Sequence, residues 1–448
     1  MRIAKRHNQF FLPTTVKINL KQLLLLLFVI LVSLQYFLVY PFLSNSSNKN
    51  NTDQNDALML QLRQEQLEKY RFTNSNNNNN ETKLFFIHVG KSGGETIKWR
   101  LRVICNIRAS ARKRAMCHEQ FSSSTAGGGS SESELSKHTI GYMHCNLLRP
   151  KTSIYESTIL MYSIRNPIDR VVSWFQYMNP KNCLPDRPSA ACNLKLDKTM
   201  YNTLSNLTWG YVLFDLCFPT INDMIQSLQN EKLVHVEDSN NNSINCSQLA
   251  IDTITGYGPP GPSNHLYFNY HYYVNKTSTL LIQSSSLAQQ QQQQQERQQT
   301  PSIPNNKKKR IFVIRKENLF DDLRTIEYIL GGSIQRPFER EGGTISHGNQ
   351  LYPYKAILDN NLMPILCCVI PKELTIYVTL VTRALNLIDS DKITSIEELY
   401  TKCDVNTNNI PIAWSSSNKN PDDVAQVFLS QMSQKCHWDK SSTMVPMP

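Results

Sequence analysis

The chain has 448 residues, enough for one large folded domain with appendages, and a formal net charge of +11. The first 21 residues contain five basic residues and no acidic one, which leaves +6 (11 minus 5) for the remainder. That surplus suits an anionic substrate and is too diffuse to indicate a nucleic-acid-binding protein.

An uncharged, mostly apolar run covers residues 23–43 (LLLLLFVILVSLQYFLVYPFL). About twenty such residues span the hydrocarbon core of a bilayer. Basic residues precede the run and none follows before Lys49, which predicts a cytosolic tail over 1–22 and a lumenal remainder. The run is longer than the apolar part of a usual signal peptide and lacks a clear cleavage site, so it indicates a transmembrane signal anchor. A cleaved signal peptide is the alternative.

Residues 44–82 are rich in Asn, Ser and Gln and predict a disordered stem with a short helical stretch around 57–70, because they hold too few apolar residues to bury a core. The folded lumenal domain is expected over 83–448. Three low-complexity insertions are expected within it, near 122–134, 238–245 and 284–309. The Asn-x-Ser/Thr triplets all follow the apolar run, which agrees weakly with a lumenal glycoprotein.

The 11 cysteines include no Cys-x-x-Cys pair and no regular histidine–cysteine ligand spacing, so zinc is not expected. They indicate disulfides in an oxidising compartment. Cys183 with Cys192, and Cys105 with Cys117, are candidate local pairs. The odd count leaves at least one thiol free or intermolecular.

The segment 84–97 reads LFFIHVGKSGGETI. Its first six residues are nearly all apolar, as in a strand that is buried on both faces. A glycine-rich turn with one lysine follows, and then a stretch with helical spacing. Glycines let backbone N–H groups converge, and a helix N-terminus and a lysine add positive charge, so the segment predicts a phosphate-binding turn. An ordinary strand–turn–helix unit with an exposed lysine is the alternative.

The segment 158–177 (TILMYSIRNPIDRVVSWFQY) predicts a buried strand that ends just before Arg165, and a helix capped by Asn166 with proline at its first position. Ser173 lies seven residues beyond the cap, or two helical turns, so Arg165 and Ser173 can face one anion. Arginine offers bidentate phosphate geometry and the hydroxyl adds a donor. The alternatives are a salt bridge for Arg165, for example with Asp169, and simple helix packing for Ser173.

Residues 139–144 (TIGYMH) alternate like a strand that ends at His144. Lys91, His144 and Arg165 thus each fall just beyond the end of a predicted strand. In parallel α/β sheets, ligands bind at the edge formed by the carboxyl ends of the strands. We therefore expect an α/β fold with a P-loop-like, three-layer arrangement around a mainly parallel sheet, and these three residues at one edge. A structural histidine is the alternative for His144.

Further elements are expected towards the C-terminus. Residues 310–314 are typical of another strand. Residues 318–330 and 372–388 place apolar side chains on one helical face and predict two packing helices, the first of which is stopped by a pair of glycines.

The sequences KSGGET at 91–96 and RNPIDRVVS at 165–173 resemble the two donor-binding motifs of sulfotransferases that use 3′-phosphoadenosine 5′-phosphosulfate (PAPS). The second motif implies that Arg165 and Ser173 bind the 3′-phosphate. The signal anchor and stem resemble the Golgi carbohydrate branch, and most closely the uronyl and heparan sulfate 2-O-sulfotransferases, in which a histidine-bearing strand lies between the motifs. The first motif implies 5′-phosphosulfate binding by Lys91, Ser92, Gly93, Gly94, Glu95 and Thr96.

The resemblance implies transfer of a sulfuryl group from PAPS to a hydroxyl of a glycan, such as an acidic polysaccharide or a glycoprotein glycan, in the Golgi lumen. His144 would act as general base, and Lys91 would stabilise charge on the leaving phosphate. No metal is required. Glu95 departs from the family, which often has a hydroxyl residue there, and it is expected to point away from the donor.

Three other functions fit parts of this pattern. Sulfation of protein tyrosine would use the same donor motifs. A P-loop kinase or NTPase is suggested by Gly90, Lys91 and Ser92, but the first glycine of G-x-x-x-x-G-K-S would fall on Phe85. A glycan-binding membrane protein without activity would not need the donor-binding and base residues to be intact.

Overall fold

The structure is a computed structural model. It describes residues 60–72, 84–92, 97, 120–121, 140–143, 159–183, 209–230, 232–235, 243–256, 264–267, 269–275, 277, 309–332, 353–405 and 420–437. The chain divides into two units, 1–64 and 65–448. Only the helical residues 60–64 of the first unit are described, and everything below concerns the second. The expected tail, signal anchor, turn residues 93–96 and His144 lie outside the described residues.

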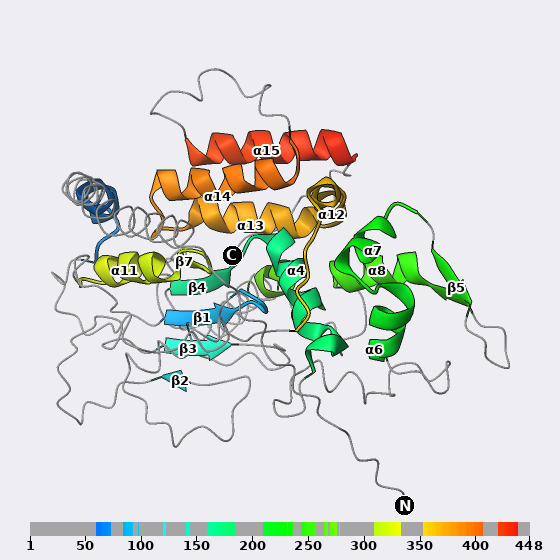
Figure 1. The fold of residues 1–448 in the computed structure, drawn as a ribbon. Helices are drawn as coiled ribbons and strands as arrows, with labels where there is room; N and C mark the ends of the chain where they lie inside the picture. Colours follow the sequence, from blue (N-terminus) through cyan, green and yellow to red (C-terminus); the bar gives the residue numbers. More distant parts are fainter. Residues whose placement is uncertain are drawn as a thin grey trace, which may run out of the picture. The chain divides into compact units, whose positions relative to one another are not determined.

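A mainly parallel sheet forms the centre of the described fold (Figure 1). Its strand order is β2-β3-β1-β4-β7, and all pairs are parallel except β2 with β3. The predicted α/β class with a mainly parallel sheet is therefore confirmed. The strands are β1 (Leu84–His88), β2 (Gln120–Phe121), β3 (Ile140–Met143), β4 (Ile159–Ile164) and β7 (Arg310–Arg315).

Strands β1 and β4 have every side chain buried, which explains their unbroken apolar sequences. Leu160 and Ile164 point into the main hydrophobic cluster, which also contains buried residues of helices α4 (Pro167–Met178) and α13 (Pro371–Arg383). Ile159 and Met161 alternate to the other face and lie outside that cluster, as does the buried Leu323. Both faces of the sheet are thus covered.

Helix α4 (Pro167–Met178) begins where the sequence predicts. The side chain of Asn166 accepts a hydrogen bond from the backbone N–H of Ile168 at 3.1 Å, and proline occupies the first helical position. Helix α11 (Leu319–Ile329) confirms the predicted helix over 318–330. The cap fixes where α4 starts, and so it fixes Arg165 at the end of β4.

Helix α13 (Pro371–Arg383) ends five residues before the predicted boundary at 388. Beyond it, Leu385 donates its N–H to the carbonyl of Ile311, and the amide of Asn386 makes paired hydrogen bonds with the backbone N–H and carbonyl of Val313. Strand β7 is the sheet edge, whose unpaired backbone groups need partners. The helix stops because residues 385 and 386 cover that edge.

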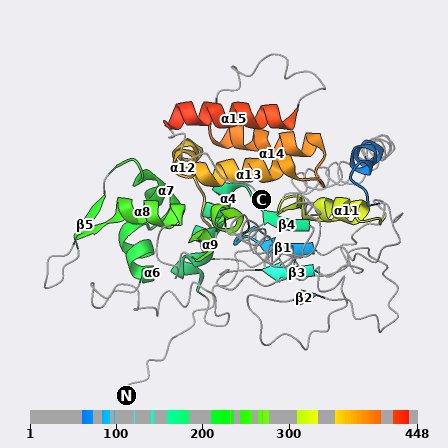
Figure 2. The same cartoon turned by 180° about the vertical axis from the view of Figure 1, so that it is seen from behind.

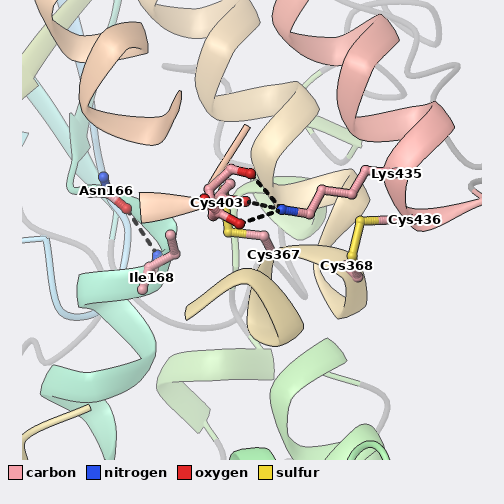
Figure 3. The surroundings of a disulfide bond; sticks show 8 residues. Asn166, Ile168, Cys367, Cys368, Cys403, Lys435 and Cys436 are labelled. Carbon is pink, nitrogen blue, oxygen red and sulfur yellow. Dashed lines mark hydrogen bonds and ion pairs between the residues drawn. A yellow bond between two sulfur atoms is a disulfide. The ribbon is translucent and has the colours of Figure 1, made fainter. Parts of the chain in front are cut away.

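Two disulfides tie α12 (Met363–Val369) to the helices that follow α13 (Figure 3). Cys367 bonds to Cys403, at the end of α14 (Asp389–Lys402). Cys368 bonds to Cys436, the last residue of α15 (Pro421–Cys436). The ammonium of Lys435, in α15, also donates to the carbonyl of Cys403 at 3.0 Å. The ends of α14 and α15 are therefore linked by this hydrogen bond as well as through the two disulfides to α12.

A smaller group of elements lies beside α4 and is best seen in Figure 2. A third disulfide, Cys217–Cys246, joins two of these elements. Cys183 is also disulfide-bonded, whereas Cys105, Cys117 and Cys192 lie outside the described residues. The elements are η3 (Pro180–Asn182), α6 (Trp209–Tyr211), η4 (Val212–Cys217), α7 (Ile221–Gln226), β5 (Leu233–His235), β6 (Ser243–Asn245), α8 (Cys246–Thr255), α9 (Asn264–Tyr267) and η5 (Asn360–Leu362).

The expected loop insertions are described only in part. The last three residues of 238–245 form β6, which pairs with β5, and Asn245 caps α8 through its side chain. Within the described ranges, no single helix has the length and apolar character needed to cross a membrane. The apolar run at 23–43 is not among those ranges.

Candidate functional site

The carboxyl ends of the parallel strands meet at one edge of the sheet. Strands β1 and β4 are neighbours, with His88 opposite Ser163, and β3 runs beside β1, with Met143 opposite Ile87. The turn after β1 and the residue after β4 therefore leave the sheet side by side, as the sequence predicts for Lys91 and Arg165. His144 directly follows β3 in sequence but is outside the described residues, as are Gly93, Gly94, Glu95 and Thr96.

The turn after β1 is packed tightly against its surroundings. A Cβ atom at Gly90 would lie 2.6 Å from Nδ1 of His265, so only glycine fits there. Lys91 adopts a left-handed conformation with φ of 65°, which is uncommon for a residue other than glycine and is often found at functional turns. The turn is thus shaped by close contact with α9, a segment far away in the sequence.

Ser92 is fully buried, and its hydroxyl bonds to the carbonyl of Val89 and, at 2.6 Å, to the hydroxyl of Ser163. The second of these bonds joins the turn after β1 to strand β4. In this structure the Ser92 side chain therefore holds the turn in place. Its predicted contact with phosphosulfate would have to come from the backbone or from rearrangement of the hydroxyl.

The ammonium of Lys91 contacts the ring of Tyr177, near the end of α4. The same ring packs edge-on against His265, with ring centres 5.7 Å apart. Ser173 lies four residues before Tyr177, so it is on nearly the same face of α4. The helix face that carries the predicted phosphate-binding serine is therefore the face that meets the Lys91 turn.

Arg165 is only loosely paired. Its Nε lies 3.8 Å from the carboxylate of Glu317, and its side chain is 17% exposed. The sequence suggested a salt bridge with Asp169, but Asp169 pairs instead with Lys402 at 2.6 Å. Among the described residues, Nε of Arg165 has no hydrogen-bond partner. Within the described ranges the other guanidinium nitrogens of Arg165 make no hydrogen bond either, so most of its donors are available to a ligand.

A second cation lies next to Arg165. Lys316 follows β7 directly, and its backbone N–H donates to the carbonyl of Ile164 at 2.9 Å. Desolvation, and then the positive charge of Arg165, lower the pKa of Lys316. Burial raises the pKa of Glu317, against the attraction of Arg165. Two cations that repel each other at neighbouring strand ends form a place where an anion is stabilised.

Four residues at this edge were not predicted: Tyr177, His265, Tyr270 and Lys316. Tyr270 bonds through its hydroxyl to the backbone of Arg165 from 105 positions along the chain. No local pattern indicates such contacts. Lys316 could have been found, because it directly follows a predicted strand, as Arg165 does.

The described residues show no group of three or more His, Cys, Asp or Glu side chains arranged to hold a metal ion. Comparisons with known proteins give no relative: no protein-family model, curated protein or solved structure matches this chain. The chemistry of the site is therefore argued from its own residues. These are a tight turn with one lysine after β1 and, after the neighbouring β4, an arginine whose guanidinium has one long ion pair among the described residues.

Proposed function

We propose that this chain is a PAPS-dependent sulfotransferase that acts on a hydroxyl of a glycan, with a domain of the P-loop-like, three-layer type. In this proposal residues 23–43 anchor it in the Golgi membrane with residues 83–448 in the lumen. The observation that carries the proposal is the parallel pairing of β1 with β4. That pairing puts the Lys91 turn and Arg165 side by side, as a ligand with two separate phosphate groups requires.

In the proposed reaction, the acceptor oxygen attacks sulfur in line with the sulfur–oxygen bond that breaks. His144 takes the proton of the acceptor hydroxyl as general base. Lys91 stabilises the negative charge on the departing phosphate oxygen. Arg165 and Ser173 hold the 3′-phosphate and so fix the donor in register. The disulfides support an oxidising, lumenal environment for this chemistry.

The structure also bears on the kinase and NTPase alternative. Phe85, which stands where a Walker A motif has its first glycine, is a buried residue within β1. Only Val89 and Gly90 separate the strand from Lys91. A loop that wraps around a triphosphate needs more residues between strand and lysine, so the turn favours a smaller anion. Tyrosine sulfation remains the second candidate, since it differs only in the acceptor.

The first experiment is binding of adenosine 3′,5′-bisphosphate to the full chain without added metal. Lys91→Ala and Arg165→Ala should each weaken binding by about 10-fold or more, the size expected for charge-assisted phosphate contacts. Lys181→Ala is a matched control for Lys91, because Lys181 also lies over a tyrosine ring but in η3. Arg383→Ala, at the exposed end of α13, is the control for Arg165. Tighter binding of ATP with magnesium would overturn the proposal.

The second experiment measures transfer of labelled sulfate from PAPS to a panel of glycans and tyrosine peptides. Transfer to a glycan hydroxyl is expected, and transfer to the peptides alone would support the second candidate. His144→Ala should abolish transfer and preserve binding of the bisphosphate, because a general base is not needed to hold the donor. Full activity of that variant would exclude His144 as the base.

A further inference from the structure

One segment contacts both halves of the candidate site. It comprises α9 and residues 269–275, of which 270–275 are helical. At one end, the ring of His265 packs against Gly90 in the Lys91 turn. At the other, the hydroxyl of Tyr270 bonds to the backbone of Arg165. We refer to residues 264–267 and 269–275 together as the brace.

The contact between Tyr270 and Arg165 is specific. The hydroxyl accepts a hydrogen bond from the Arg165 N–H at 2.8 Å and donates one to the Arg165 carbonyl at 2.5 Å. Tyr270 is fully buried, and burial raises the pKa of its hydroxyl, so the hydroxyl keeps the proton that it donates. Both polar groups of the Arg165 backbone are thereby fixed by one side chain.

A buried ion pair holds the brace itself. Arg170 of α4 and Glu373 of α13 lie 2.9 Å apart, and both are almost completely buried. Arg170 also donates to the carbonyl of His265, in α9, at 2.8 Å. Glu373 accepts the backbone N–H groups of Tyr270 and His271, which are the first residues of the following helix. Arg170 thus binds a backbone carbonyl of α9, and Glu373 caps the two backbone N–H groups that open the next helical segment.

Packing alone does not require this arrangement. A buried ion pair costs desolvation energy and is often no more stabilising than apolar residues of similar volume. Here Arg170 donates one further hydrogen bond to the backbone of the brace, and Glu373 accepts two from it. Among the described residues, Nε of Arg170 has no hydrogen-bond partner. The pair therefore fixes where His265 and Tyr270 stand relative to each other, which is a matter of geometry at the site.

We propose that the brace sets the separation between the Lys91 turn and Arg165, and that Tyr270 is a positioning residue for the phosphate bound at Arg165. This inference rests on the proposed function, because it assumes a ligand with one phosphate at each half. It predicts that loss of the Tyr270 hydroxyl affects recognition of the 3′-phosphate selectively. A role in general stability would affect all ligands alike.

The test compares adenosine 3′,5′-bisphosphate with adenosine 5′-monophosphate, which lacks the phosphate expected at Arg165. Tyr270→Phe in the full chain should lower affinity for the bisphosphate about 10-fold and change affinity for the monophosphate less than about 2-fold. Tyr162→Phe is the matched control: Tyr162 is equally buried in β4 but bonds to Thr277, not to Arg165. Its preference for the bisphosphate should equal that of the wild type.

A double variant separates positioning from general damage. In an Arg165→Ala background, Tyr270→Phe should cause no further loss of bisphosphate affinity, because the guanidinium that Tyr270 positions has been removed. An equal loss in both backgrounds, or an unchanged preference in the single variant, would overturn the role of the brace. If the wild type itself shows no preference for the bisphosphate, the proposed function fails and the brace fails with it. The two failures are therefore distinguishable.

Discussion

Arg165 and Arg315 stand at the ends of neighbouring parallel strands, and their surroundings are opposite. Ile164 is in register with Arg315, so the two arginines are almost adjacent. Arg315 forms a bidentate pair with Asp322, and it also bonds to the carbonyl of Asp391 and the hydroxyl of Ser395. In the part of the chain that the structure describes, the side chain of Arg165 has only the long contact with Glu317. An arginine at a strand end is a candidate ligand residue only when the fold leaves its donors unused.

The difference comes from the residues that follow each strand. After β7, the chain turns into α11, whose first turn carries Asp322 back to Arg315 at 2.7 Å. After β4, the first turn of α4 carries Asp169 to Lys402 instead. Burial lowers the pKa of Lys402, but its hydrogen bonds with Asp169 and Glu398 outweigh this effect and raise the pKa above its usual value. Lys402 therefore stays charged and paired with Asp169. By engaging Asp169, α14 keeps the guanidinium of Arg165 available.

The largest effect is expected from replacing Arg315, whose donors are used in hydrogen bonds within the protein. Arg315→Ala should lower the free energy of unfolding by about 3–5 kcal/mol, because it leaves the buried carboxylate of Asp322 without its partner. Arg165→Ala should change it by less than about 1 kcal/mol, because among the described residues its guanidinium makes only the 3.8 Å contact with Glu317, a carboxylate that is itself partly exposed. Urea unfolding of both variants measures the contrast. Equal losses would show that Arg165 is also structural.

A somewhat smaller effect is expected from the disulfide that anchors α14. This helix supplies Asp391 and Ser395 to Arg315, and its end is tied down by Cys367–Cys403, a link between residues 36 positions apart. Replacing both cysteines by serine should cost about 2–4 kcal/mol of unfolding free energy. The preference for bisphosphate over monophosphate should stay unchanged as long as Lys402, which precedes Cys403, keeps its ion pair with Asp169, because the contacts of the brace involve α4 and α13 instead. Loss of that preference would show that the anchoring of α14 is coupled to ligand binding at Arg165.

Local signals were sufficient to predict the strands and the start of α4. Unbroken apolar runs predict β1 and β4, and Asn166 followed by proline predicts the helix start. The end of α13 was not predictable in this way. Its apolar periodicity continues to Ile388, but Asn386 leaves the helix to pair with β7. That choice depends on which strand lies at the sheet edge, which only the tertiary structure decides.

In the candidate site, too, some features could be predicted from local sequence and others depend on the tertiary structure. The position of Lys91 and Arg165 at one edge follows from the rule for parallel strands, given only that both segments are strands. Their partners do not follow from it. Glu317 takes the place expected for Asp169, and Tyr270 reaches Arg165 from a helix with no distinctive sequence pattern. Sequence reasoning located the cations, and the fold determined what surrounds them.

A modest effect is expected from removing the carboxylate of Glu317, which pairs with Arg165 at 3.8 Å. Glu317→Gln should raise affinity for adenosine 3′,5′-bisphosphate about 2- to 5-fold, because the partly exposed carboxylate would repel the phosphate bound at Arg165. The effect of such a partly exposed charge is expected to stay below about 1 kcal/mol. The gain should shrink as salt is added. Asp321→Asn is the control, since Asp321 lies in the first turn of α11 but pairs with Arg324. Weaker binding by the Glu317 variant would instead make Glu317 part of the site.

The smallest expected effect is a pH dependence of stability. It arises from a histidine in the brace, which contacts Arg165 and not Arg315. Burial, and then the charge of Lys372, lower the pKa of His271 in the brace, against the attraction of Glu373. The backbone N–H of His271 donates to the carboxylate of Glu373, which is paired with Arg170. As pH falls below about 6.5, the unfolded chain binds a proton that the folded chain does not, so the free energy of unfolding should decline until pH is below the folded pKa.

His271→Asn should remove this part of the decline, which unfolding curves at about pH 7.5 and 5.5 can measure. The side chains described around Arg315 include no histidine, so Arg315→Ala should retain the same pH dependence as the wild type. If acidification also weakens the preference for bisphosphate in the wild type but not in His271→Asn, the brace transmits the titration of His271 to Arg165. An identical pH slope in wild type and His271→Asn would show that His271 takes no part in it.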